Sequence, residues 1–252
     1  MNAGTPASDG ALLSIRGVTK AFSGLTALDD VTFDVQPGQI MGLIGPNGAG
    51  KTTLFNVIAG SFPPTAGEVF LRDQPVTGLP SHRIARAGIA RTYQLMKPFG
   101  TLSVRDNVLV AALQRTRSME EARTRAGDVV ERVGLSNWAD DLAAGLSTAG
   151  RKRLELARAL ALEPDLLLLD EVLAGLVPSE RAPVMELLAE IRHGGVTMLF
   201  VEHVMAAVME LSDEIVVLHH GQVLATGTPD QVTKDPAVVE AYLGEEQTDA
   251  DA

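Results

Sequence analysis

The stretch GLIGPNGAGKTT, residues 42–53, decides the fold expected for this chain. It contains the pattern G-x-x-x-x-G-K-[ST], completed by Gly45, Gly50, Lys51 and Thr52. An apolar strand over Ile40–Ile44 precedes the pattern, and an amphipathic helix that ends near Gly60 follows it. Loops of this kind turn successive backbone amides toward phosphate oxygens, while the lysine reaches the terminal phosphates and the hydroxyl ligates Mg²⁺. The pattern therefore predicts a nucleotide-binding loop. Its members are Gly45, Pro46, Asn47, Gly48, Ala49, Gly50, Lys51, Thr52 and Thr53.

A second candidate lies in LLLLDE, residues 166–171, where two carboxylates close an apolar run. In α/β proteins ligands bind at the carboxyl ends of the strands, which is where Asp170 would lie. An aspartate there suits a metal-bound water, and Glu171 beside it could act as general base on an attacking water. The alternative is a pair of solvated carboxylates at a strand end.

Two further polar residues close predicted strands. His203 follows TMLFVE (197–202), and Gln94 follows GIARTY (88–93). A single histidine in such a place is more often a core or capping residue, and a single glutamine is usually an edge residue. Neither residue identifies a site by itself.

The segment LSTAGRKRLELARAL, residues 146–160, predicts a helix with an unusual distribution of charge. Arg151, Lys152 and Arg153 fall in the expected first turn, where unpaired N–H groups already make the helix end positive. A buried stripe follows, formed by Leu154, Leu156, Ala157, Leu160 and Ala161. Either the basic turn is simply solvated, or another molecule supplies an anion to it.

Composition excludes several classes of protein. The chain has 252 residues and a net charge of −11, which disfavours nonspecific binding of DNA or RNA. It has no cysteine, so disulfides and thiolate zinc sites are excluded. We expect a disordered tail over residues 1–10, a loose acidic tail over residues 246–252, and no leader peptide or membrane span.

The remaining sequence predicts a mixed α/β chain. Alternating runs near residues 12–18, 31–35 and 67–73 suit an antiparallel sheet, and the continuous runs 40–44, 166–169 and 198–201 suit buried parallel strands. Residues 214–227 predict a hairpin broken at His220 and Gly221. Residues 101–162 show helical pattern only, and Ser103, Ser118 and Thr228 are expected helix caps.

The order of these motifs resembles that of the ATP-binding cassette (ABC) ATPases, over residues 12–244. The resemblance implies a P-loop NTPase core with an antiparallel β subdomain and an inserted α-helical subdomain. The domain would cover residues 11–245, and the helical insertion about 101–162. It also implies roles for single residues. Lys51 and the loop would hold ATP, Thr52, Gln94 and Asp170 would hold Mg²⁺, Glu171 would be the general base, and His203 would contact the γ-phosphate. Phe22 falls where the family places an aromatic ring under adenine, although packing within a strand would also explain it.

The same resemblance offers an answer to the charge of residues 146–160. In that family two ATPase subunits meet head to tail, and the segment after the LSGGQ-type signature faces the nucleotide of the partner. Here Ser147, Thr148, Ala149 and Gly150 occupy the signature positions, so the missing anion would be the ATP of a second subunit.

Other segments are similar to ATPase subunits of importers for branched-chain or other hydrophobic amino acids. They include RKRLELARAL (151–160), AGLVPSE (174–180) and the final GTPDQVTKDPAVVEAYLGEE (227–246). This likeness implies two membrane permease subunits, an extracytoplasmic solute-binding protein, and a peripheral position on the cytoplasmic face of the membrane. Residues 95–99 and the helical lobe would contact the permeases.

Three other functions stay open from sequence. The subfamily motifs are shared with importers of urea, amides and other amino acids. A soluble ABC ATPase of DNA repair or translation would carry a second cassette or long insertions, which this chain lacks. A regulatory nucleotide binder without turnover is disfavoured by Glu171 and His203.

Two positions depart from the family pattern. Ala149 and Gly150 stand where LSGGQ has Gly and Gln, and Val177 stands where the family usually has Asp or Asn. A Val cannot make a polar contact across a dimer. We therefore expect the composite site built on this chain's signature to be the weaker of two in a heterodimer.

Overall fold

Two β-sheets organise the chain in the computed structural model, which describes residues 10–92 and 97–249. The first sheet has the order β2-β1-β4-β5 and is antiparallel throughout. Its strands are β1 (Leu13–Phe22), β2 (Leu25–Val35), β4 (Ala66–Leu71) and β5 (Gln74–Pro75). The antiparallel sheet expected from the alternating runs is confirmed.

The second sheet has the order β10-β9-β3-β8-β7-β6. Its strands are β3 (Ile40–Ile44), β6 (Ile89–Arg91), β7 (Leu166–Asp170), β8 (Thr197–Val201), β9 (Glu214–His219) and β10 (Gln222–Gly227). All pairs are parallel except β9 with β10. The strands β3, β7 and β8 are buried along their whole length because both faces of this sheet are covered. Leu166 and Leu168 enter one core, while Leu167 and Leu169 enter the other.

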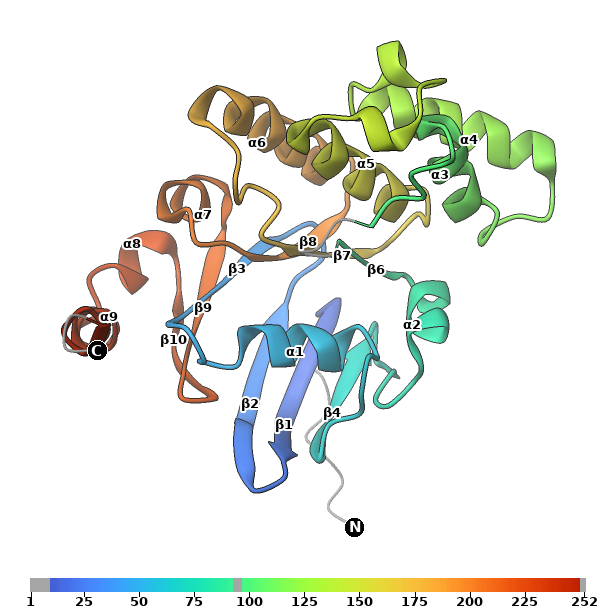
Figure 1. Ribbon diagram of the computed structural model, residues 1–252. Coiled ribbons are helices and arrows are strands. Elements are labelled where there is room, and N and C mark those ends of the chain that lie inside the picture. The colour runs from blue at the N-terminus through green and yellow to red at the C-terminus, as the bar shows by residue number, and fades with distance from the viewer. Residues whose placement is uncertain (1–9, 93–96, 250–252) are drawn as a thin grey trace.

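Helix α1 (Lys51–Ile58) lies between the two sheets (Figure 1). Its buried side chains Leu54, Phe55 and Ile58 share a core with β1, β2 and one face of β3 and β8. The first residues of α1 are thereby held at the carboxyl end of β3, which is the edge where ligands bind in such sheets.

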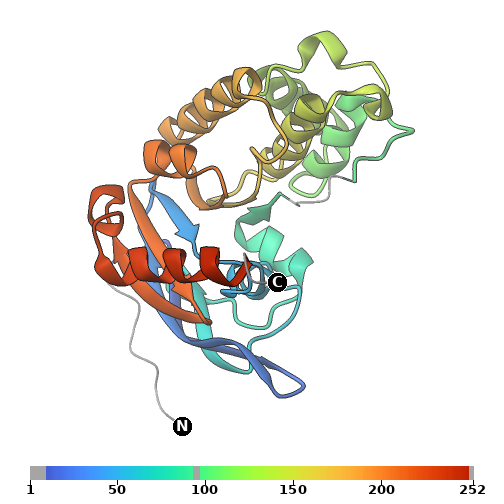
Figure 2. The same cartoon turned by 60° about the vertical axis from the view of Figure 1, so that its left-hand side comes forward.

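Helices cover the opposite face of the six-stranded sheet. They are α3 (Val104–Ala112), α4 (Met119–Arg132), α5 (Thr148–Leu160), α6 (Pro178–His193) and α7 (Met205–Leu211), with short 3₁₀ turns at Ser136–Trp138 and Ala143–Gly145. Ser103 and Ser118 cap α3 and α4 as expected, each hydroxyl accepting from the amide three residues later. Both views show α3, α4 and α5 grouped on the side away from the antiparallel sheet (Figures 1 and 2). Helix α2 (Ser81–Ala87) precedes β6.

The chain closes with the expected hairpin and two helices. The turn between β9 and β10 uses His220 and Gly221, both with positive φ (47° and 80°), as a two-residue hairpin turn requires. Helices α8 (Pro229–Val232) and α9 (Pro236–Asp249) follow, and Thr228 caps α8 as expected.

The loose acidic tail was expected from residue 246, but α9 continues to Asp249. Once a helix exists, each added residue gains one hydrogen bond, and Glu and Gln are good helix formers. The rest of the two expected tails, residues 1–9 and 250–252, lies outside the described residues. Across the described ranges, none of the helices has both the length and the apolar character that crossing a bilayer demands.

Candidate nucleotide-binding site

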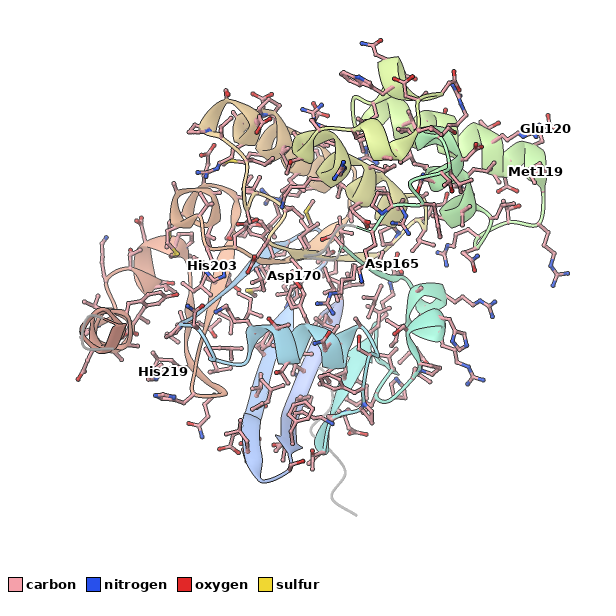
Figure 3. All side chains as sticks on the ribbon, viewed as in Figure 1. Met119, Glu120, Asp165, Asp170, His203 and His219 are labelled. Atoms are coloured by element: carbon pink, nitrogen blue, oxygen red, sulfur yellow. The ribbon has the colours of Figure 1, made fainter. Side chains whose placement is uncertain are left out.

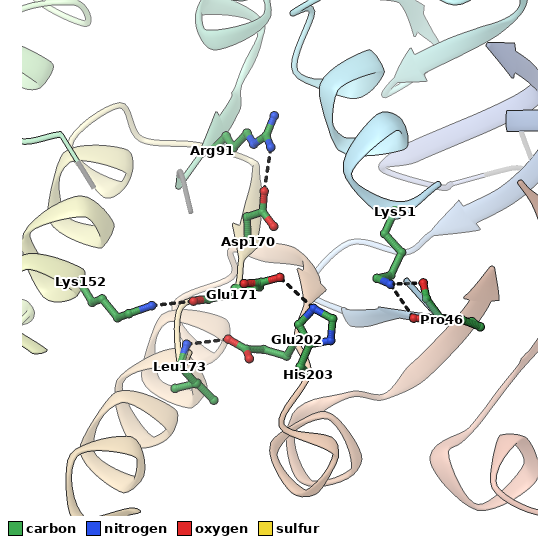
Figure 4. Close-up of polar contacts among 10 residues, drawn as sticks. Pro46, Lys51, Arg91, Lys152, Asp170, Glu171, Leu173, Glu202 and His203 are labelled. Carbon is green, nitrogen blue, oxygen red and sulfur yellow. Dashed lines mark hydrogen bonds and ion pairs between the residues drawn. The ribbon is translucent and has the colours of Figure 1, made fainter. Parts of the chain in front are cut away.

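The loop of residues 45–50 joins β3 to α1, and its geometry requires glycine at position 45. Gly45 has φ 147°, and a Cβ there would lie 2.1 Å from the carbonyl oxygen of Leu218 in β9. Any other residue would push the loop off the sheet. Lys51 is buried, and its Nζ donates to the carbonyl oxygens of Gly45 (2.5 Å) and Pro46 (2.7 Å) (Figure 4). The ammonium group therefore sits within the curve of the loop.

The β9–β10 turn packs on this loop from the other side. The N–H of Gly221 donates to the carbonyl of Ala49 (3.1 Å), and the carbonyl of Gly221 accepts from the N–H of Asp29 in β2 (2.9 Å). The β9–β10 hairpin thus connects the loop of residues 45–50 to both sheets.

The loop opens into a pocket of about 220 Å³, where residues 47–53 lie together with Glu171 and His203. Helix α1 starts at Lys51 without a side-chain cap or an acidic residue in its first turn, so its N-terminus is available to an anion. The pocket is lined by Ala27, Asn47, Gly48, Ala49, Gly50, Lys51, Thr52, Thr53, Glu171, Val201 and His203.

Glu171 and His203 meet at the carboxyl edge of neighbouring strands β7 and β8. Nε2 of His203 lies 2.8 Å from Oε1 of Glu171, whose carboxylate accepts the hydrogen bond (Figure 4). Glu171 has a left-handed backbone with φ 51°, and its N–H donates to the carbonyl of Val201 (2.9 Å). The carboxylate is mostly buried, while the imidazole is half exposed. The pair can accept a proton from a water in the pocket.

Asp170 turns toward β6 and pairs with Arg91 at 2.7 Å, with both side chains buried. Arg91 also donates to Oδ1 of Asn56 in α1 (2.6 Å), and the N–H of Asp170 donates to Oγ1 of Thr92 (3.2 Å). Asp170 and His203 both lie near the middle of the molecule, whereas Met119 and Glu120 mark its far end (Figure 3). The Asp170 carboxylate is therefore held by Arg91, directly before Glu171 in the chain.

Three of the four signature residues, Ser147, Ala149 and Gly150, line a different cavity, of about 450 Å³, which contains none of the loop residues. Ser147 caps α5, its Oγ accepting from the N–H of Gly150 (3.1 Å). The basic residues were expected in the first turn, but Thr148, Ala149 and Gly150 form that turn. The cap begins the helix at Thr148, which moves Arg151 and Lys152 one turn inward. There they donate to the carbonyl oxygens of Ala144 (2.9 Å) and Glu171 (2.6 Å).

Comparison with known proteins agrees with this geometry. Residues 28–174, more than half of the chain, match the family described as "ABC transporter". The high-affinity branched-chain amino acid transport ATP-binding protein LivG of Escherichia coli is 43% identical over 250 residues, covering 93% of this chain and 98% of that protein. The corresponding protein BraF of Pseudomonas aeruginosa is 40% identical, with the same coverage.

The chain belongs to the ABC transporter ATPases.

Two further matches place it within that family. Residues 222–248, from β10 into α9, match the family described as "Branched-chain amino acid ATP-binding cassette transporter". A crystal structure of the ADP conformation of an ATP-binding cassette superimposes with a TM-score of 0.85 at 31% identity, over 93% of this chain and 99% of that one. The resemblance inferred from the motifs, the fold class and ATP hydrolysis as the activity are thereby confirmed.

Of the described residues expected at the ABC site, Gly45, Pro46, Asp170 and Phe22 do not line the pocket of Lys51. The ring of Phe22 is partly exposed, lies edge-on to Phe62 at 5.3 Å between centroids, and is covered by Nζ of Lys20 at 4.9 Å. It does not line the pocket of Lys51. Gln94 lies outside the described residues.

Three residues beside the ABC site were missed by sequence reasoning: Arg91, Lys152 and Glu202. Burial raises the pKa of the Glu202 carboxyl, against the opposing effect of the Leu173 N–H and the Lys152 charge. Burial also lowers the pKa of Lys152, although Glu202 and Glu171 oppose this. The sequence did carry a signal at two of these positions, because Arg91 and Glu202 are charged residues at the ends of otherwise apolar strands.

Proposed function

We propose that this chain is the ATPase subunit that powers a branched-chain amino acid importer. The observation that carries the proposal is the match of residues 222–248 to the branched-chain family, joined to 43% identity with LivG over nearly the whole chain. In this reading ATP binding closes a dimer of ATPases, and hydrolysis reopens it.

The proposed ATP site is the pocket of about 220 Å³ at the start of α1. Lys51 and the loop residues 45–53 would bind the phosphates. Glu171 would take a proton from the attacking water, and His203 would contact the γ-phosphate. Phe22 would stack under adenine, supported by its exposed ring at the end of β1.

The residues near the pocket also fit a magnesium ion. Mg²⁺ takes one or two protein oxygens and otherwise keeps water and phosphate oxygens. Thr52 lines the pocket, and the carboxylate of Asp170 lies directly before Glu171, paired with Arg91 at 2.7 Å. These two, with Gln94, would hold the ion, which neutralises negative charge on the phosphates.

We further propose that the working form contains a second ATPase subunit. Ser147, Ala149 and Gly150 line a cavity of their own, and neither that cavity nor the pocket of Lys51 joins the loop to the signature. A head-to-tail dimer would bring each loop against the signature of its partner. The N-terminus of α5 would then face an anion, as a helix N-terminus favours.

Two permease subunits would hold this dimer at the cytoplasmic face of the membrane, with an extracytoplasmic solute-binding protein acting through them. Phe99 supports a contact of this kind, because it is a large apolar side chain with 48% of its surface exposed. Residues 95 and 96 of the same predicted contact lie outside the described residues.

The proposal is tested by Glu171→Gln in the complex of the chain with its permeases. Removing a general base lowers rates by roughly 10²–10⁴-fold, so phosphate release and leucine uptake into proteoliposomes should both fall by that order. Binding of a fluorescent ATP analogue should persist, since the loop is intact. Glu240→Gln, an exposed change on α9 outside the helical lobe, is the matched control and should behave as wild type.

The solute class needs a separate measurement. Uptake of leucine, isoleucine and valine is compared with that of urea and short amides, using the solute-binding protein encoded with the complex. Uptake of urea or amides alone would move the chain to those related importers. Copurification with nucleic acid in place of permeases would indicate the soluble ABC class.

A further inference from the structure

Two side chains outside the pocket hold the backbone directly after Glu171. Nζ of Lys152, on α5, donates to the carbonyl oxygen of Glu171 at 2.6 Å. Oε1 of Glu202, at the end of β8, accepts from the N–H of Leu173 at 2.6 Å (Figure 4). The peptide groups directly after Glu171 are thus fixed by one cation and one carboxylate.

The conformation held in this way is not one that a glutamate adopts freely. Glu171 has φ 51°, and a non-glycine residue in the left-handed region is strained and persists there only where its surroundings hold it. That backbone directs the carbonyl of Glu171 to α5 and leaves its carboxylate on His203. Loss of either anchor would free the segment to relax and move the carboxylate.

Burying the ionisable side chains of Glu202 and Lys152 costs free energy. Glu202 is 2% exposed and Lys152 is half-buried. Oε2 of Glu202 makes no hydrogen bond within the part of the chain that the structure describes. Buried charges of this kind add little to stability compared with apolar packing, so their presence calls for a role other than stability.

We propose that Lys152 and Glu202 are positioning residues that hold Glu171 in its reactive orientation. The inference rests on the proposed function, in which Glu171 is the general base. Neither residue lines the pocket of Lys51. They act on the rate of the chemical step and not on the affinity for nucleotide.

The experiment separates these two quantities in the full-length chain assembled with its partner subunits. Lys152→Met removes the donor and Lys152→Arg keeps one; Glu202→Leu removes the acceptor and Glu202→Gln keeps one. Phosphate release is measured against ATP concentration, and rates are normalised to the sites that bind a fluorescent ATP analogue. Lys234→Met, an exposed change near the C-terminus, is the control.

We expect Lys152→Met and Glu202→Leu to lower kcat roughly ten- to a hundredfold, the cost of a misplacement near 1 Å. KM and the analogue Kd should stay within about twofold of wild type. Lys152→Arg and Glu202→Gln should recover most of the rate, which a general loss of packing would not predict.

Wild-type kcat in the Met and Leu variants would overturn the proposal. So would an equal loss of nucleotide affinity, or the absence of recovery in the Arg and Gln variants. Glu171→Gln is measured beside them: unchanged turnover in that variant would overturn the assignment of the base itself, and the positioning roles with it.

Discussion

The carboxyl of Glu202 titrates differently in the folded protein and in the unfolded chain. It is buried at the end of β8, next to His203, and its carboxyl has a raised pKa because desolvation outweighs the Leu173 N–H and Lys152. Its protonation state in the folded protein therefore differs from that in the unfolded chain over part of the pH range.

This difference has a defined effect on stability. As pH rises above the ordinary glutamate value of 4.5, the unfolded chain releases the Glu202 proton while the folded protein keeps it up to its higher pKa. The free energy of unfolding contributed by Glu202 therefore falls with rising pH across that window and then levels off. Glu202→Gln removes the titration, so we expect this variant to gain stability relative to wild type across the window. Urea unfolding at a series of pH values measures the difference, and parallel curves for the two proteins would contradict it.

Single residues were predictable from sequence where they ended a recognisable motif. Lys51, Glu171 and His203 converge on one pocket because parallel strands end at one edge. The sequence marked Arg91 as a charge at a strand end, but the contacts of Arg91 and Lys152 were not predictable. They depend on how β6 lies beside β7 and how α5 faces residue 171. A sequence motif identifies the residues within it, but not the side chains from other elements that contact them.

Among the elements, the turn of residues 99–103 before α3 is held by one buried amide. The side chain of Asn107 accepts from the N–H of Phe99 (2.8 Å) and donates to the carbonyl oxygens of Phe99 (3.1 Å) and Ser103 (2.9 Å). Arg158 of α5 stacks on the Phe99 ring at 5.4 Å and pairs with Glu155 of the same helix. Helix α5 therefore contacts the Phe99 turn through Arg158 and the Glu171 segment through Lys152.

Asn107→Ala should loosen this turn. Because Asn107 is fully buried, its loss leaves backbone groups without partners, at a cost of roughly 1–3 kcal/mol in the free energy of unfolding. Denaturant titration of purified protein measures this cost. Asn137→Ala, at an exposed site, should change stability by less than about 0.5 kcal/mol; equal effects from both variants would argue against the role of Asn107.

Phe99→Ala should lower transport more than basal ATP hydrolysis. The proposed reason is that the exposed ring contacts a permease, while the pocket of Lys51 lies elsewhere. Uptake and phosphate release are measured on the same proteoliposomes. Val239→Ala is the control, since Val239 is 42% exposed but lies on α9, outside the helical lobe. A proportional loss of both activities in Phe99→Ala would refute the contact.

Most helices and strands could be predicted from the periodicity of apolar residues and from helix caps, but some of their boundaries could not. The apolar strands, the hairpin and the caps of α3, α4 and α8 came out as expected. The start of α5 and the end of α9 did not. In both cases local hydrogen bonding decided the boundary: the Ser147 hydroxyl began α5, and continued helix propagation extended α9.

At the scale of the whole molecule, the proposed dimer would contain two unequal ATP sites. Val177 is 54% exposed and apolar, and Ala149 and Gly150 replace the usual signature residues. The site made from this chain's loop, Glu171 and His203 is proposed to be the competent one. The site completed by this chain's signature would depend on the weaker contacts.

Paired substitutions measure that inequality. Glu171→Gln in this chain should remove more of the ATPase activity of a heterodimer than the matching change in the partner subunit. The physical reason is that only the first change disables the site proposed to be competent. Phosphate release by the two singly changed complexes gives the comparison, and equal losses would count against asymmetry.

The turn at Gly221 has a consequence for anyone who builds chimaeras between transporters. The match to the branched-chain family starts at residue 222, which invites a crossover at that point. However, the turn just before it braces Ala49 and Asp29, so a foreign β10 would be grafted directly onto the support of the phosphate loop. A crossover after Gly227 keeps that brace native and exchanges only α8 and α9.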